Sequence, residues 1–129
     1  MMKAGEYYIG DLCYVLHDRW DEFCALTING NNVLDGEFNF KDGTRFATFT
    51  TKYGDGCYYD EQGNEYPVDA GLIGCINVDD IAPNERDNMV SGRVIEFIQD
   101  FSTFSAGGVI RFGSVVIDTD ATEEYEEDY

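Results

Sequence analysis

The amino-acid sequence predicts a mostly β fold, all-β or α+β, in which an antiparallel bent sheet or small barrel of about seven strands carries one short N-terminal helix. Two observations favour this class. Aromatic residues make up 15% of the chain and the 14 Gly far outnumber the 2 Pro, which suits twisted strands punctuated by turns. The apolar segments are also short and show no sustained β-α-β alternation, so a parallel sheet is not expected.

The first part of the chain is expected to hold a strand and the helix. Residues 6–16 have the composition of a strand, with Gly10 and Asp11 at a bulge or tight bend in its middle. Asp18 is expected to cap a short helix over 19–27. Four side chains with helical spacing form one face of that helix, which is expected to dock on the sheet: Trp20, Phe23, Cys24 and Thr27.

The segment from 36 to 51 predicts a β-hairpin. Asp42 and Gly43 match a two-residue turn that needs positive φ, and aromatic residues alternate on both sides of it. Pairing across such a turn leaves Phe46 as an exception on the polar face, because successive side chains point to opposite faces. The other face gathers the remaining apolar side chains of the hairpin: Phe38, Phe40, Ala47 and Phe49.

A second hairpin is expected over 57–69. Residues 60–63 suit a type I turn, and Pro67 marks an edge strand or a strand end, since proline cannot donate to the ladder. Residues 70–81 contain an apolar run with β-branched side chains, which predicts a buried strand.

The polar segment 82–92 is expected to be the longest internal loop. Two further strands are expected over 93–101 and 108–119, and the connection between them ends in Gly107 and Gly108, which mark a turn. Apolar residues lie on both faces of these strands. We therefore expect both faces of the sheet to be covered, by a second sheet or by the helix.

Charge and composition predict a single β-rich domain over 1–117 and a flexible acidic tail over 118–129. The tail, DTDATEEYEEDY, holds seven acids and no base and lacks apolar content. The whole chain carries 26 acidic and 8 basic residues, a net charge of −18. Because like charges repel, direct binding to nucleic acid is not expected, and a basic partner, a cation or simple solubility remain.

The sequence predicts a cytoplasmic protein without a membrane partner, a metal or another cofactor. No apolar run approaches the roughly 20 residues that cross a bilayer, and MMKAGEYYIG lacks the apolar stretch of a signal peptide. The four Cys show no C-x-x-C spacing and are interpreted as small buried side chains. His17, the only histidine, is interpreted as a capping or surface residue rather than the partner of Cys13 in a nucleophilic pair.

The motif Gly-Asp-x-Cys-Tyr occurs twice, starting at Gly10 and at Gly54. A functional interpretation places Asp11, Asp55 and Asp69 around one cleft, for acid–base chemistry or for binding a hard cation. The structural interpretation, which we favour, gives each Gly an unusual backbone angle and lets each Asp accept backbone hydrogen bonds. Each Cys then points into the core, and each Tyr hydroxyl reaches water. The common catalytic signatures are absent, and no catalytic residue is assigned.

The end of the acidic tail is the candidate partner-binding segment. Its carboxylates alternate with tyrosines, a pattern that can imitate the phosphates and stacked bases of a nucleic-acid strand and so fit a basic groove. A solvating tail is the alternative. The candidate residues are Glu123, Glu124, Tyr125, Glu126, Glu127, Asp128 and Tyr129.

Three segments, YIGDLCYVL, WDEFC and YGDGCYYDEQGNEYPVDAGLIG, occur in this order. They resemble a group of small bacteriophage and bacterial proteins without assigned activity, over residues 7–117. The resemblance implies a phage or mobile-element origin, and hence the host cytoplasm. Together with the charge, the sequence predicts a non-enzymatic acidic module that binds a basic protein surface, as a nucleic-acid mimic or inhibitor. The alternative is a small enzyme or cation-binding protein with an Asp-lined cleft.

Overall fold

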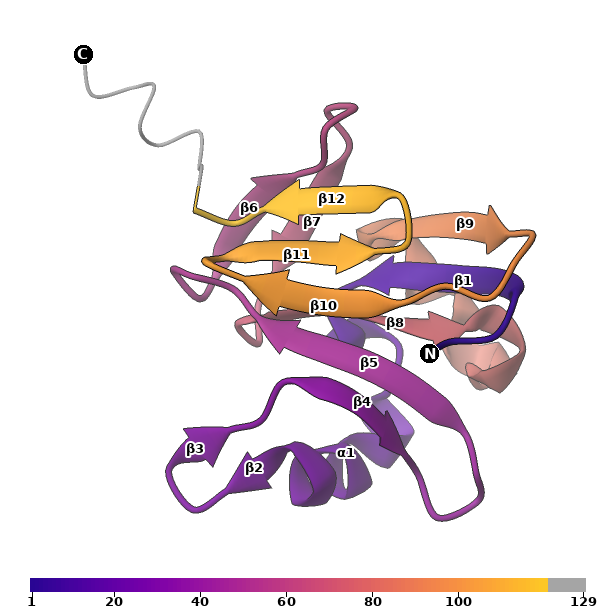
Figure 1. Cartoon of the computed structure of the whole chain (residues 1–129). Coiled ribbons are helices and arrows are strands. Elements are labelled where there is room, and N and C mark those ends of the chain that lie inside the picture. Colours follow the sequence, from indigo (N-terminus) through magenta and orange to yellow (C-terminus); the bar gives the residue numbers. More distant parts are fainter. Residues whose placement is uncertain (121–129) are drawn as a thin grey trace.

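The computed structural model describes residues 1–120, which form several antiparallel β-sheets (Figure 1). The largest sheet has five strands, in the spatial order β4 (Gly36–Asn39), β5 (Arg45–Thr50), β8 (Leu72–Asn77), β1 (Gly5–Gly10) and β9 (Arg93–Phe97). A second sheet contains β10 (Thr103–Ala106), β11 (Val109–Phe112) and β12 (Val115–Asp118). Two hairpins complete the set: β2 (Ile28–Asn29) with β3 (Asn32–Val33), and β6 (Gly56–Tyr59) with β7 (Glu65–Val68).

The predicted mostly β class is confirmed, but the strands are shorter and more numerous than expected and do not close into a single barrel. The helical part of residues 1–120 is one α-helix and four 3₁₀ segments, none of them long and apolar enough to cross a membrane. These elements are α1 (Trp20–Thr27), η1 (Leu12–Tyr14), η2 (His17–Arg19), η3 (Val78–Asp80) and η4 (Pro83–Ser91).

Both faces of the five-stranded sheet are covered, as the apolar pattern predicted. Side chains alternate across a sheet, so neighbours on one strand belong to different cores. Tyr7 and Ile73 belong to the core shared with the β10-β11-β12 sheet and the β6-β7 hairpin. Tyr8 and Ile76 belong to the core shared with α1 and the 3₁₀ segments. In Figure 1 the three-stranded sheet lies above β5, and α1 lies below β4.

The hairpin of β4 and β5 has a three-residue loop, 41–43, where a two-residue turn was expected. Phe38 pairs with Phe46, and Gly43 has a φ of 93°. A loop of this length ends in a left-handed residue that glycine adopts without steric cost. The register is therefore shifted by one residue from the expected one. The expected position of Phe46 on a polar face is wrong, because a one-residue shift exchanges the two faces.

Phe46 is fully buried at the centre of an aromatic cluster that joins the sheet to α1. Its ring centroid lies 4.9 Å from that of Phe40 and 5.1 Å from that of Phe23. Trp20 stacks on Phe23 at 4.5 Å. The predicted docking face of the helix is thus confirmed.

Several connections differ from the expected ones. The first strand ends at Gly10, since Asp11 and the following residues turn into η1. Segment 82–92 is mainly the helical element η4, which begins at Pro83, a residue that favours the first turn of a helix. The expected strand over 108–119 is interrupted between β11 and β12, and the expected connection 102–108 contributes β10.

The C-terminal part of the described chain is tied to the domain beyond Ile117. β12 continues to Asp118, and Thr119 is fully buried, with its hydroxyl donating a hydrogen bond to the carbonyl of Gly108. The backbone amide of Lys52 donates to the Thr119 hydroxyl at 3.0 Å. Residues 118–119 therefore belong to the folded domain.

Replacing Phe46 with Ala is expected to lower the free energy of unfolding by about 3–5 kcal/mol, because it empties the centre of the aromatic cluster. Phe104→Ala is the matched control: Phe104 is 52% exposed, so the same change is expected to cost less than about 1 kcal/mol. Urea denaturation followed by Trp20 fluorescence measures both variants. Equal losses would contradict the register that buries Phe46.

Candidate functional site

Asp11 is completely buried, and its carboxylate is occupied by backbone amides. Its Oδ1 accepts a hydrogen bond from the Cys13 amide at 2.9 Å. Its Oδ2 accepts from the amides of Asp69 and Ala70, at 2.8 and 2.6 Å. Hydrogen bonds to a charged acceptor are stronger than neutral ones. Asp11 therefore acts as a clamp between the end of β1 and the loop that precedes β8.

Asp69 lies beside Asp11 through its backbone, but its own carboxylate is exposed on the loop. It accepts a hydrogen bond from the Tyr14 hydroxyl at 2.9 Å. Burial, and then the hydrogen bond to Asp69, raise the pKa of Tyr14 above its ordinary value. Burial, followed by the bond to and the charge of Asp11, raises the pKa of the Cys13 thiol to about 12. Cys13 is thus a neutral thiol at pH 7 and a poor nucleophile.

Asp55 does not join this cluster. It is exposed in the loop before β6 and forms no hydrogen bond or ion pair with residues 1–120. The carbonyl of its neighbour Gly54 accepts hydrogen bonds from the hydroxyls of Thr51 and Tyr58, at 2.7 and 2.9 Å. The two Gly-Asp-x-Cys-Tyr motifs are therefore not equivalent. The structural interpretation describes Asp11 correctly but is wrong for Asp55. Its unusual backbone angle is found at Gly54, with a φ of 75°, but not at Gly10. Cys13 and Cys57 are only partly buried, and the Tyr58 hydroxyl bonds to Gly54 instead of reaching water.

The expected helix cap at Asp18 is also wrong, because α1 has no side-chain cap at its N-terminus. The amides at the start of η2, just before α1, are bound instead by Glu85 of η4. The Glu85 side chain is 4% exposed, and its carboxylate accepts the amides of His17 and Asp18 at 2.9 and 3.3 Å. The same carboxylate lies 2.8 Å from His17 Nδ1. His17 therefore contacts Glu85, and a nucleophilic pair with Cys13 has no geometric support.

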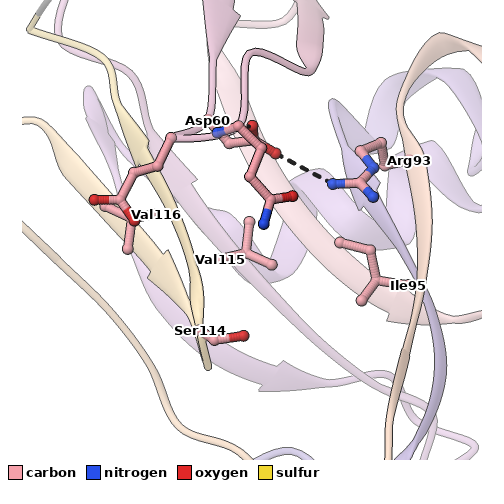
Figure 2. A pocket seen from close by; sticks show the side chains of 8 residues that line it. Asp60, Arg93, Ile95, Ser114, Val115 and Val116 are labelled. Carbon is pink, nitrogen blue, oxygen red and sulfur yellow. Dashed lines mark hydrogen bonds and ion pairs between the residues drawn. The ribbon is translucent and has the colours of Figure 1, made fainter.

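A pocket of about 170 Å³ lies between β9 and β12, the outermost strands of their two sheets, and is closed by the turn of the β6-β7 hairpin (Figure 2). Figure 2 shows Arg93 and Ile95 of β9 on one side, and Val115 of β12 with Ser114 of the preceding turn on the other. Both polar and apolar side chains contribute to its wall. The lining residues are Asp60, Glu61, Gln62, Arg93, Ile95, Ser114, Val115 and Val116.

Asp60 anchors this pocket. Its side chain is 4% exposed and accepts hydrogen bonds from Asn64 N and Tyr66 Oη at 3.0 and 2.8 Å. It also forms an ion pair with Arg93 at 3.3 Å. Burial raises the pKa of Asp60, but the hydrogen bonds, led by the Asn64 amide, outweigh it and hold the pKa below its ordinary value. The sequence placed Asp60 at a turn but gave no signal of its pairing with Arg93.

Carboxylates dominate the surface of the described residues. Residues 1–120 contain 21 acids and 8 bases, and sixteen of these acids are exposed. Five of the basic side chains already form ion pairs with Asp or Glu, which removes most of the positive charge available to the surface. These five are Lys3, Arg19, Arg45, Lys52 and Arg93. Within the same residues, no group of His, Cys, Asp and Glu side chains is arranged to hold a metal ion.

The chain matches no protein-family model, no curated protein and no solved structure. The candidate partner-binding residues from Glu123 to Tyr129 lie outside the described part of the structure.

Replacing Asp11 with Asn is expected to lower the free energy of unfolding by about 2 kcal/mol, since the amide group turns a donor toward backbone N–H groups that need an acceptor. Asp55→Asn, at an exposed site, is expected to change it by less than about 0.5 kcal/mol. Chemical denaturation compares the two variants. A small loss for Asp11→Asn would argue against the clamp.

The loss of stability at acid pH is expected to depend on Asp60. Its pKa is lower in the folded chain than in the unfolded chain. Its contribution to the stability of the fold is therefore fully present above the pKa of the unfolded chain, about 3.9, and is lost as the pH falls through the pKa of the folded chain. Asp60→Asn should lower the Tm at neutral pH and should weaken the loss of Tm on acidification. Tm measured against pH tests this. If the Tm of the variant and of the wild type fell equally on acidification, Asp60 would not be the group responsible.

Proposed function

We propose that the protein is a non-enzymatic acidic module that binds a basic surface on a protein partner. One observation carries this proposal: sixteen exposed carboxylates stand against basic side chains that are mostly neutralised within the domain. An excess of one charge at the surface attracts a partner of opposite charge and accelerates its encounter. It also repels nucleic acid, whose phosphates carry the same sign.

The groups that an enzyme would use are engaged in holding the fold. Asp11 accepts three backbone amides, Cys13 has a raised pKa, and His17 contacts Glu85. Asp55 is exposed and forms no hydrogen bond with Asp11. These contacts favour a binding role over the alternative, a small enzyme or cation-binding protein with an Asp-lined cleft.

In its sharper form, the proposal is a nucleic-acid mimic that inhibits a nucleic-acid-binding protein, encoded by a phage and acting in the host cytoplasm. A groove that binds phosphates presents Lys and Arg at regular intervals, and spaced carboxylates can occupy the same positions. The last residues of the chain add stacking aromatics to such carboxylates, at Tyr125 and Tyr129.

The test is capture of proteins from a bacterial lysate on the immobilised full chain and on a chain ending at Asp120, which keeps the buried Thr119. We expect basic nucleic-acid-binding proteins to be retained at about 50 mM salt and released at about 500 mM, because salt screens the attraction. A double-stranded DNA oligonucleotide should compete with the chain for them. Weaker retention by the shortened chain would assign part of the affinity to the last residues.

A pair of charge variants provides the control for this experiment. Asp21→Asn, Asp55→Asn and Asp87→Asn together remove three exposed charges, whereas Asn29→Asp, Asn31→Asp and Asn84→Asp add three at exposed positions. Retention should fall in the first variant and rise in the second. Partners that are not basic, or that resist high salt equally in all variants, would overturn the proposal, and capture of no partner would favour the Asp-lined site instead.

A further inference from the structure

We propose that the outer edge of β9 is the docking site for an extended basic segment of the partner, which adds to the five-stranded sheet as a further strand. This inference rests on the proposed function and specifies how the partner binds. It is carried by three observations on β9: an unpaired edge, an unneutralised pair of carboxylates, and a pocket beside the strand.

The edge of β9 is open within the part of the chain that the structure describes. β9 is the last strand of its sheet and pairs on one side with β1, in unbroken register from Gly5↔Phe97 to Ile9↔Arg93. Soluble proteins usually protect such an edge with a proline, a bulge, a covering segment or charged side chains, and of these β9 carries the exposed charge of Glu96. β9 has no proline and no bulge in this register. Its outward backbone groups can therefore pair with an extended peptide, the mode of recognition called β-augmentation.

Two carboxylates stand directly opposite each other next to this edge. Glu6 of β1 pairs with Glu96 of β9, which places their Cβ atoms about 5 Å apart. Both are exposed, and neither forms an ion pair or hydrogen bond with residues 1–120. At the opposite edge of the same sheet, Glu37 of β4 is neutralised by the terminal amino group and by Arg45. A Lys or Arg opposite Glu96 on an added strand would relieve the repulsion.

Two other side chains of β9 define which residues should flank the basic residue on the added strand. Val94 shares a face with Glu96 and is 40% exposed, so it suits an apolar neighbour on the added strand. Ile95 points to the other face and lines the pocket between β9 and β12 (Figure 2). A side chain opposite Ile95 would enter that pocket. The edge therefore selects three successive residues: apolar opposite Val94, apolar opposite Ile95, and basic opposite Glu96.

A second copy of this chain fits the edge poorly. Pairing β9 with β9 would bring two Glu6–Glu96 pairs together, between chains that each carry a net charge of −18. The repulsion would not be relieved by any basic residue of β9, because Arg93 is paired with Asp60. The charge of the edge therefore favours a basic peptide over self-association.

The test uses labelled peptides with the core Val-Leu-Lys and its reverse, Lys-Leu-Val, because the edge admits a parallel or an antiparallel strand. Fluorescence anisotropy measures their binding to the full chain. At least one peptide is expected to bind, and N-methylation of alternate backbone amides should abolish its binding. Amide hydrogen exchange of residues 93–97 should slow in the complex.

Two variants separate the edge from general charge attraction. Glu96→Lys should lower the affinity for the peptide at least about tenfold, and Lys→Glu in the peptide should restore binding to this variant. Asp21→Lys changes the net charge equally but lies on α1, far from β9 in Figure 1, and should weaken binding less than about twofold.

Each other outcome overturns the docking site. Absence of binding by both peptides, equal losses in the two variants, or tolerance of N-methylation would exclude strand addition, and a dimer in sedimentation would assign the edge to self-association. In these cases, salt-sensitive capture of basic proteins would leave the proposed function standing. Failure of that capture alone would remove the proposed function.

Discussion

The junction between β1 and β8 is the constraint on which the rest of the structure depends. Gly10 pairs with Gly74 across the centre of the sheet. A Cβ at Gly74 would lie 2.3 Å from the Ala47 carbonyl and 2.7 Å from Leu12 Cδ1, so only glycine lets Leu12 pack there. Leu12 reaches this place because Asp11 caps η1 and binds the loop before β8. The sheet, its helical cover and the loop are thereby fixed at one point.

Local patterns predicted those elements whose partners are close in the sequence. The helical spacing of Trp20 and Phe23 identified a buried face, and the β-branched run of 70–81 identified β8 at the centre of the sheet. The register of Phe46 could not be predicted in the same way. Two-residue and three-residue turns both accept Asp-Gly, and the difference of one residue decides which face is buried.

The candidate site was predicted in part only. Asp11 was singled out by its motif, but the same motif singled out Asp55, and spacing alone cannot tell a buried acceptor from an exposed one. Glu85 and the Asp60–Arg93 pair were missed, since their partners lie far away in the chain. The pocket and the open edge of β9 depend on strand order, which periodicity does not encode. Charge was predictable because it is a property of composition.

The place of β1 in the sheet has a consequence for synthesis of the protein. Tyr8 of this N-terminal strand pairs with Ile76 on one side and with Val94 on the other. β1 therefore cannot enter the sheet until β8 has left the ribosome, and its second neighbour, β9, follows later still. During this interval unpaired apolar strands are exposed to one another on neighbouring chains. The repulsion between nascent chains rich in Asp and Glu opposes their association, so the same charge that suits the folded protein for a basic partner also protects its folding.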